Sequence, residues 1–235
     1  MSQSTVKTGV RQRRERGSIT PEEIIKGAFA VADRDSLDNL SMPELARHLG
    51  VGVTSVYWYF RKKDDLIQTM SDQAIRTVHS QLPEPEDPAQ WRAYLAGYFR
   101  RMRQVFLAND TISDLVLVRT RSYSLPATHL TYQGVEDALE MLVRAGFTPL
   151  TAWNLYSALS IFTRGIIISE RIQRMNNAPS LDDRQIKLLE PEKMPLLTTL
   201  VGEESISLSM VGDDNFEYGI EAMLETFERQ LQSEK

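Results

Sequence analysis

The sequence predicts an all-α protein, and three observations support this fold class. Apolar residues recur at intervals of three or four through most of the 235-residue chain, and no run alternates with the period of two that marks a strand. Two segments open with a hydroxyl side chain followed closely by proline and glutamate, which is a typical helix start. Hydrophobic residues make up 42% of the chain, which is enough to build a buried core.

The first 17 residues are the most basic stretch of the chain. Five basic residues face a single acidic one there: Lys7, Arg11, Arg13, Arg14 and Arg16 against Glu15. The whole chain carries a net charge of −5, so a basic end precedes an acidic body. This asymmetry indicates a polyanion that is met at one end only. We predict a disordered tail over residues 1–17, which either contacts that polyanion or is inert.

Three short helices are predicted next. The first starts at Thr20, whose hydroxyl can cap a helix that begins with proline. The second starts at Ser41, which stands three residues before a glutamate as in a capping box. It ends at Gly50, because glycine is common just past the last turn of a helix. The third covers residues 53–60.

Residues 41–63 have the features of a helix-turn-helix. Gly50 permits the tight turn between the second and third helices. The four consecutive aromatic residues at 57–60 cannot all face one side of a helix, because each residue turns by about 100°. Some of them must be exposed, which favours a contact surface over a purely structural role as core aromatics. With the basic triplet at 61–63, this surface can reach base edges and phosphates, so we predict a DNA-binding domain over residues 18–64.

Residues 65–235 are predicted to form a larger helical domain. A linking helix over 63–82 leads into it, and three prolines within residues 83–88 mark the clearest boundary of the chain. The stretch 176–195 is polar and punctuated by proline, and is predicted to be flexible. The helical patterns that remain cover, in order, about 89–108, 111–121, 126–145, 149–174, 195–201 and 214–231.

Two of these helices have faces that suit a partner helix. The last one carries an apolar stripe of six residues: Phe216, Ile220, Met223, Leu224, Phe227 and Leu231. That stripe is wider than a small neighbouring core needs. The helix at 149–174 alternates bulky and small residues, which permits close crossing of helices. We predict that the two helices form the four-helix seam of a homodimer, and the alternative is that both faces pack within one chain.

Several classes of function are excluded or disfavoured. The chain has no cysteine, so disulfides, thiolate metal sites and a cysteine nucleophile are excluded. The three histidines are not spaced as a metal pair on one helix, and there is no phosphate-cradling glycine loop. The longest apolar stretch is interrupted by Arg164, and the N-terminus is not a signal peptide. We expect a cytoplasmic protein that is not an enzyme, needs no metal or cofactor, and contacts no membrane.

Several runs of the sequence resemble the TetR family of transcriptional regulators, and within it the branch of the tetracycline repressor. They are residues 40–51 with Val56-Tyr57-Trp58-Tyr59-Phe60 and Lys63 in the N-terminal part, and Trp91, Gly146-Phe147, Ser157-Ala158-Leu159, Phe162, Gly165, Met194-Pro195-Leu196-Leu197 and Gly219 with Leu224-Glu225 in the rest. The resemblance covers nearly the whole chain, and it is most specific in the N-terminal part. It implies a DNA-binding domain followed by a ligand-binding and dimerisation domain.

The resemblance implies which residues contact DNA. Val53, Thr54 and Ser55 correspond to the positions that read base edges. The positions that fix the recognition helix on the DNA backbone and thymine methyls are Tyr57, Trp58, Tyr59 and Lys63, and Ser41 joins the DNA-contacting set. Two positions depart from the repressor, because Pro43 and Val53 replace its arginine and glutamine. Both bidentate readers are lost, so this chain is not expected to prefer the tetracycline operator.

The resemblance also implies the ligand pocket. The matching positions are His79, Tyr98, Met102, Arg121, Val135, Ala138, Trp153 and Tyr156. A lone interior histidine is more often a satisfied core residue than a ligand contact, and both roles remain open for His79. The repressor's magnesium-ligating histidine falls at Val116 or Leu117, and an apolar side chain offers no ligand to a hard cation. The effector is therefore expected to be lipophilic or aromatic and to bind without metal.

The sequence thus predicts a ligand-responsive transcriptional regulator, acting as a repressor that a small effector releases from an inverted-repeat operator. Its partners are double-stranded DNA, the effector and a second copy of the chain. Two alternatives remain at this stage. One is a helix-turn-helix DNA-binding protein without ligand control, and the other is an all-α enzyme acting on a small molecule.

Overall fold

The computed structural model describes residues 19–118, 123–176, 188–202, 208 and 210–233. Every regular element in these ranges is helical, which confirms the predicted fold class. The predicted tail at 1–17, Arg121 and most of the stretch 176–195 lie outside the described residues. None of the helices that the structure describes is long and apolar enough to cross a membrane.

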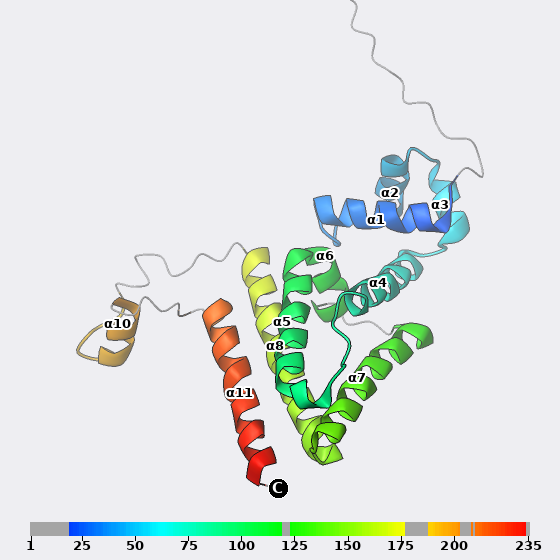
Figure 1. Cartoon of the computed structure of the whole chain (residues 1–235). Coiled ribbons are helices and arrows are strands. Elements are labelled where there is room, and N and C mark those ends of the chain that lie inside the picture. Colours follow the sequence, from blue (N-terminus) through cyan, green and yellow to red (C-terminus); the bar gives the residue numbers. More distant parts are fainter. Residues whose placement is uncertain (1–18, 119–122, 177–187, 203–207, 209, 234–235) are drawn as a thin grey trace, which may run out of the picture.

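The elements follow the predicted order (Figure 1). The N-terminal module consists of α1 (Pro21–Asp35), α2 (Met42–Leu49) and α3 (Val53–Tyr59), and α4 (Lys63–His79) connects it to the body. The body contains a 3₁₀ turn (Pro88–Gln90), α5 (Trp91–Ala108), α6 (Asp110–Ser113), a π-helical turn (Asp114–Val118), α7 (Leu125–Ala145), α8 (Pro149–Met175), α10 (Pro195–Gly202) and α11 (Asp213–Ser233).

The N-terminal module is held by local signals and a small core. Thr20 forms the capping box with Glu23 at the start of α1, and the Ser41 hydroxyl accepts the Glu44 backbone N–H at the start of α2. Gly50 ends α2 with a φ of 69°, a left-handed conformation that glycine adopts without strain. The apolar side chains at the centre are fully enclosed, including Ile24, Ala28, Val31, Leu45 and Val56. The helix caps, the turn at Gly50 and this small core together fix the orientation of α3.

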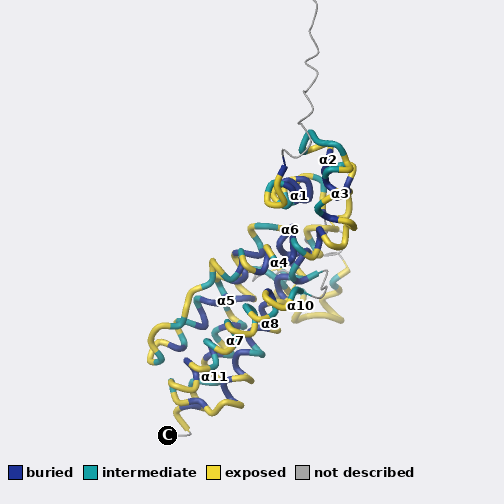
Figure 2. The backbone as a smooth tube through the Cα atoms, turned by 90° about the vertical axis from the view of Figure 1, so that its right-hand side faces the viewer, coloured by how far each residue is buried: buried dark blue, intermediate teal, exposed yellow. Residues whose placement is uncertain are grey.

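The helix α4 is the bridge between the module and the body. It packs against α1 on one side, and against α7 and the π-helical turn on the other. Its buried face consists of Leu66, Ile67, Met70, Ser71, Ala74, Ile75 and Val78. Figure 2 shows the buried residues along the facing sides of these helices, with the module at one end of the molecule and the C-terminal end of α11 at the other. Any shift of α4 within the body is therefore transmitted to the module.

The body is built around α8, which packs against α5, α7 and α11. The helices α8 and α11 approach closely at Gly219, where an added Cβ would lie 2.2 Å from the Phe162 ring. A buried ion pair joins α5 to α8, since the Arg103 guanidinium donates to both carboxylate oxygens of Glu170 at 3.2 and 2.5 Å. Arg103 also lies over the Phe216 ring, 4.8 Å from its centroid. These long-range contacts define the central layer of the domain.

Three sequence expectations differ from the structure in detail. The linking helix ends at His79, and residues 80–82 form a turn. The helix expected over 111–121 is a single turn of α6 followed by the π-helical turn. Four of the six residues on the apolar stripe of α11 are buried within the chain: Phe216, Ile220, Leu224 and Leu231. The stripe therefore packs mainly within the chain, where α11 contacts both α5 and α8.

Candidate nucleic-acid interface and ligand pocket

The exposed face of α3 is apolar, aromatic and hydroxylic. Trp58 is 77% exposed, Tyr57 45% and Val53 37%, whereas Val56 is fully buried. The run of four aromatics divides as helical geometry predicts, because Phe60 is buried and Tyr59 is half-buried. The exposure of Trp58 beside Tyr57 agrees with the contact surface predicted from the sequence, and contact with DNA remains a prediction.

Tyr59 supports this surface from behind. Its hydroxyl donates to the Ile19 carbonyl at 2.8 Å, which fastens the end of α3 to the residues that enter α1. Its ring meets Trp58 edge-on, with 4.5 Å between the ring centroids. The DNA contact expected for Tyr59 therefore has to come from the ring edge, because the hydroxyl proton is engaged inside the module.

Around α3, the polar groups are arranged for an anionic partner. The helix α3 carries no charged side chain, and Arg61, Lys62 and Lys63 follow it with exposed side chains. Lys63 reaches back to the module, with its Nζ 3.5 Å from the Asp38 carbonyl. Ser41 and Thr54 are exposed, and Ser55 is half-buried. The DNA-contact residues expected from the sequence thus lie on or beside one helix, with hydroxyls at its start and cations just past its end.

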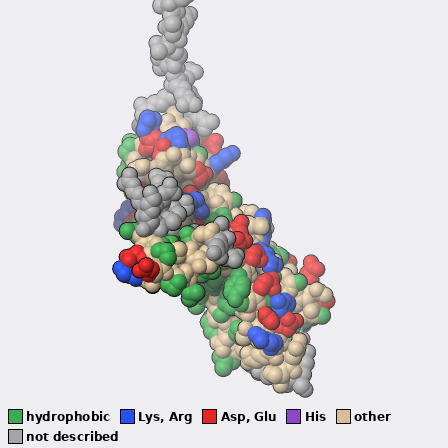
Figure 3. Space-filling view, turned by 90° about the vertical axis from the view of Figure 1, so that its left-hand side faces the viewer, with side chains coloured by type: hydrophobic (Ala, Val, Ile, Leu, Met, Phe, Trp, Pro, Cys, Tyr) green, Lys and Arg blue, Asp and Glu red, His purple; other side chains and the backbone are tan. Residues whose placement is uncertain are grey.

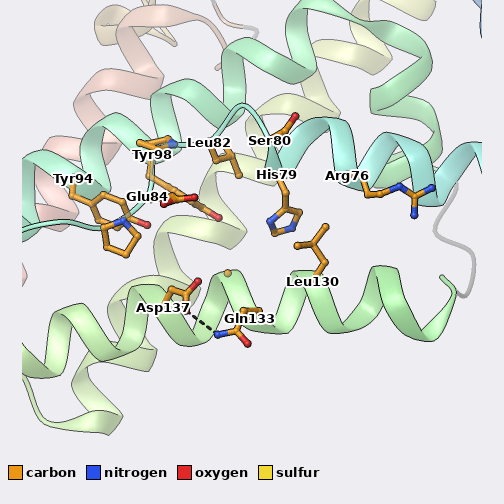
Figure 4. Close-up of a pocket in the computed structure, with 13 residues that line it drawn as sticks. Arg76, His79, Ser80, Leu82, Glu84, Tyr94, Tyr98, Leu130, Gln133 and Asp137 are labelled. Atoms are coloured by element: carbon orange, nitrogen blue, oxygen red, sulfur yellow. Dashed lines mark hydrogen bonds between the residues drawn. The ribbon is translucent and has the colours of Figure 1, made fainter.

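A cavity of about 340 Å³ opens where α4, α5 and α7 meet (Figure 4). This volume is in the usual range for a small-molecule site. The lining residues come from α4, the proline-rich segment after it, α5 and α7: Arg76, His79, Ser80, Leu82, Pro83, Glu84, Pro85, Tyr94, Tyr98, Leu130, Gln133, Gly134 and Asp137. In Figure 4, His79 extends from the end of α4 toward α7, and Arg76 points away from the other labelled side chains.

The seven expected ligand residues that the structure describes take different places relative to this cavity. His79 and Tyr98 line it, and Tyr156 packs behind Tyr98 with 6.3 Å between ring centroids. Met102 and Ala138 are buried in the core, and Val135 is half-buried, but none of the three lines the cavity. Trp153 is not in it either, because it is half exposed on the outer face of α8. Ligand contact by these residues remains a prediction.

Most of the lining residues were not expected from the sequence. Among them are five that bear on which ligand would fit: Glu84, Tyr94, Leu130, Gln133 and Asp137. Glu84 belongs to the proline-rich segment, which was interpreted only as a boundary. A usable signal existed in the helices. Tyr94 and Tyr98 stand four residues apart, and Leu130, Gln133 and Asp137 follow the spacing of three and four that places residues on one helical face.

Burial favours the neutral forms of three lining residues, His79, Tyr94 and Tyr98. Burial lowers the pKa of His79, which favours the neutral imidazole. Burial also raises the pKa of Tyr94, with the nearby Asp137 and Glu84 carboxylates adding to the effect. The pKa of Tyr98 is raised for the same main reason, and Tyr156 adds to it. At neutral pH the phenols are therefore hydrogen-bond donors with intact aromatic faces.

The end of α4 is in tight contact with α7. A Cβ added to Gly134 would lie 3.0 Å from Cε1 of His79, so the glycine permits the imidazole to approach the α7 backbone. Farther along α4, the Asp72 carboxylate accepts the Ser124 backbone N–H at 3.1 Å, directly at the start of α7. The two helices are thus in contact at two separate places, Asp72 with Ser124 and His79 with Gly134.

A buried ion-pair network connects α8 to the region beside the module. Arg171 donates to both oxygens of Asp114 at 2.8 Å and to Asp110 at 3.0 Å. Asp114 begins the π-helical turn, and α6 beside it packs against α1. Among the residues that the structure describes, no group of three or more His, Asp or Glu side chains is placed to hold a metal ion. Val116 and Leu117 lie in the π-helical turn.

The outer face of α8 is apolar and exposed. Five large apolar residues are exposed along the helix: Leu150, Trp153, Ile161, Ile172 and Met175, with Gly165 and the charged Arg164 between them. Figure 3, which views the molecule from the side of α10 and α11, shows hydrophobic side chains gathered in the middle and ionic ones along one edge. Between α5 and α11, Arg92 and Arg100 pair with Glu217, Glu221 and Glu228. An apolar stripe of this length is unusual on the surface of a monomer.

Comparison with known proteins gives consistent matches over both regions. A family model described as bacterial regulatory proteins of the tetR family matches residues 24–70. A second, described as a tetracyclin repressor-like C-terminal domain, matches residues 84–231. The chain is 42% identical over 221 residues to an HTH-type transcriptional repressor of Mycobacterium tuberculosis, and the match covers 92% of this chain and 83% of the relative.

More distant matches agree in fold. The tetracycline repressor protein class D of Escherichia coli is 23% identical over 212 residues, and the match covers 89% of both chains. Among solved structures, ActR of Streptomyces coelicolor in complex with actinorhodin superposes with a TM-score of 0.69 at 22% identity. That superposition covers 92% of this chain and 99% of ActR. At this identity the likeness shows a shared architecture.

Proposed function

The chain belongs to the TetR family of bacterial regulatory proteins, and we propose that it is a homodimeric repressor that a small effector releases from an inverted-repeat operator. Family membership confirms that the chain is a helix-turn-helix transcriptional regulator and not an enzyme. The repressor role is supported by the mycobacterial relative, which is described as a transcriptional repressor and matches most of both chains.

Binding to DNA is assigned to the surface of α3 and the residues around it. Val53, Thr54 and Ser55 are proposed to read base edges, because they stand at the start of the helix where a recognition helix enters the major groove. Tyr57, Trp58 and Lys63 are proposed to hold the helix on the backbone, with Ser41 joining them from α2. The observation that carries this assignment is the 77% exposure of Trp58, together with the three basic residues that follow α3 in the chain.

Dimerisation is assigned to the outer face of α8. Its exposed apolar stripe needs a partner, and Gly165 leaves room for a second helix to cross closely. Burying Trp153 and Ile161 between two copies would remove large apolar surfaces from water at about 25 cal/mol per Å². A two-fold dimer presents two copies of α3, and it therefore reads a two-fold DNA site.

Control by an effector is assigned to the cavity between α4, α5 and α7. The helix α4 starts at Lys63 beside the recognition helix and ends at His79 in the cavity. A ligand that separates α7 from His79 would tilt α4 and change the distance between the two recognition helices. Coupling free energies of this kind are typically about 1–3 kcal/mol. The lining combines two tyrosine rings and several apolar side chains with six charged or polar ones, which fits an aromatic effector that carries a polar or charged group and is bound without metal.

The experiment that tests the repressor function is in vitro selection of DNA from a random pool by the full-length protein. The expected product is an inverted repeat whose half-sites lie about one helical turn apart, or a multiple of it. Footprinting then maps protection onto both half-sites. Selection of sequences without two-fold symmetry, or of none at all, would contradict the proposal.

A further inference from the structure

We propose that the effector pocket recognises an organic cation with aromatic or lipophilic substituents, held between Glu84 and Asp137 against the faces of Tyr94 and Tyr98. This inference rests on the effector role proposed above and adds the charge of the ligand. It follows from how the charged and aromatic groups are distributed along the cavity.

The two acidic residues of the lining gather at its aromatic end. Glu84 and Asp137 are the carboxylates among the lining residues, and Tyr94 lines the same cavity. Burial is the main cause of the raised pKa of Tyr94, and the charges of both carboxylates add to it. Asp137 is half-buried on α7, and the Gln133 amide donates to its Oδ1 at 2.9 Å, which orients the carboxylate. Glu84 arrives from the proline-rich segment on the other side of the cavity (Figure 4). An anion at this end would face two like charges.

The aromatic end also offers ring faces to a cation. The Tyr94 and Tyr98 rings are 5.7 Å apart between centroids and tilted by 44°, so they form two walls of one corner. A cation within about 6 Å of such a ring centroid is attracted by the ring quadrupole, and the attraction grows when water is removed. Tyr98 is 5% exposed, so contact with its face takes place away from bulk water.

The cationic side chains near the cavity do not neutralise this end. Arg76 is exposed, donates to Gln73 at 3.4 Å, and points away from the other labelled lining residues in Figure 4. His79 is held toward its neutral form by burial. Arg164 of α8 opposes the rise that burial causes in the pKa of Tyr98 and Tyr156, and it is not among the residues that line the cavity. The corner between Glu84, Asp137 and Tyr94 therefore favours an incoming positive charge.

The test compares ligands of one shape and opposite charge. Tetraphenylphosphonium and tetraphenylborate are nearly isosteric, and triphenylphosphine oxide serves as a related neutral compound. Binding to the full-length protein is measured by isothermal titration calorimetry. We expect the phosphonium to bind at least tenfold more tightly than either of the others. Tighter binding of the borate or of the neutral oxide would overturn the inference.

Matched variants locate the site. The double substitution Glu84→Gln with Asp137→Asn should weaken phosphonium binding at least tenfold. The control is Glu86→Gln with Glu136→Gln, which removes two exposed carboxylates from the same segment and the same helix but outside the cavity. It should leave the affinity within about twofold, because neither Glu86 nor Glu136 lines the cavity. Equal loss in both double variants would show a general charge effect and would overturn the site.

The experiment separates this inference from the proposed function. If the phosphonium binds through Glu84 and Asp137 but leaves the operator affinity unchanged, the cation site stands and the effector role fails. If the neutral oxide binds in the cavity and releases the operator while the phosphonium does neither, the effector role stands and the cation inference fails.

Discussion

The N-terminal module and the helical body use residues in different ways. In the module, the residues assigned to DNA lie within about 20 positions of one another, and caps and a tight turn fix their directions locally. In the body, the cavity joins α4, the proline-rich segment, α5 and α7, so its lining residues are up to 61 positions apart, from Arg76 to Asp137. A surface built from neighbouring residues can thus be identified from the sequence pattern, whereas a pocket between distant helices depends on how those helices pack.

The largest effect is expected for a substitution in the dimer interface proposed on α8. Ile161→Glu places a charge in the middle of the exposed stripe of α8 and should convert the dimer into a monomer. Operator affinity should fall about 100-fold or more, because the second half-site no longer binds intramolecularly. Sedimentation equilibrium and fluorescence anisotropy measure both quantities. The control is Tyr218→Glu on α11, which is 79% exposed but lies off the stripe of α8. A dimer that persists in Ile161→Glu would contradict the assigned seam.

The next effect separates the two kinds of DNA contact within the module. Lys63→Ala should weaken binding to every sequence and reduce the slope of log affinity against log salt by about 1. Thr54→Ala should instead cost about 1–3 kcal/mol at one base pair and relax the preference there. Anisotropy titrations over a salt series and a panel of mutated operators distinguish the two. A changed base preference with an unchanged salt slope in Lys63→Ala would reverse the assignment.

Packing between distant helices is tested at Gly219. The substitution Gly219→Ala forces the Phe162 ring away, because the new Cβ would lie 2.2 Å from it. We expect a loss of about 1–3 kcal/mol in unfolding free energy, measured by urea denaturation. Gly97→Ala on α5 is the control, since its Cβ meets nothing within 4 Å. That control should stabilise the protein by roughly 0.5–1 kcal/mol. Similar effects of the two substitutions would contradict the close α8–α11 packing.

The smallest effect is a pH dependence from His79. Burial lowers its pKa in the folded state, so the unfolded chain binds a proton at higher pH than the native protein does. Stability from this residue is thus lost as the pH falls below about 6.5, the ordinary value for histidine. The variant His79→Gln should show a flatter dependence of stability between about pH 5 and 7 than the wild type. The same slope in both proteins would show that His79 is equally solvated in the two states.

The sequence predicted the N-terminal module better than the helical body. The all-α class and the boundaries of the first two helices were predictable, because the capping residues Thr20, Ser41 and Gly50 act within one turn. The end of α4 and the π-helical turn at 114–118 were not, because no local signal marks them. The exposure of Trp58 was predictable from helical periodicity. The burial of the α11 stripe within the chain was not predictable from the sequence. An apolar helix face looks the same in the sequence whether it packs against α5 and α8 or against a second chain. Glu84 and Asp137 were missed for a similar reason, since only the crossing of α4 and α7 gives them a common cavity.

The most direct test of the account is reciprocal titration of operator and effector. The effector is the compound that raises the melting temperature most in a screen of aromatic and lipophilic molecules, because stabilisation reports affinity. We expect it to lower operator affinity roughly 5- to 150-fold, and the operator to weaken effector binding by the same factor. Both values should be unchanged in the presence of a chelator. Equal effector affinity with and without operator would contradict the coupling through α4, and loss of effector binding on chelation would contradict a metal-free pocket.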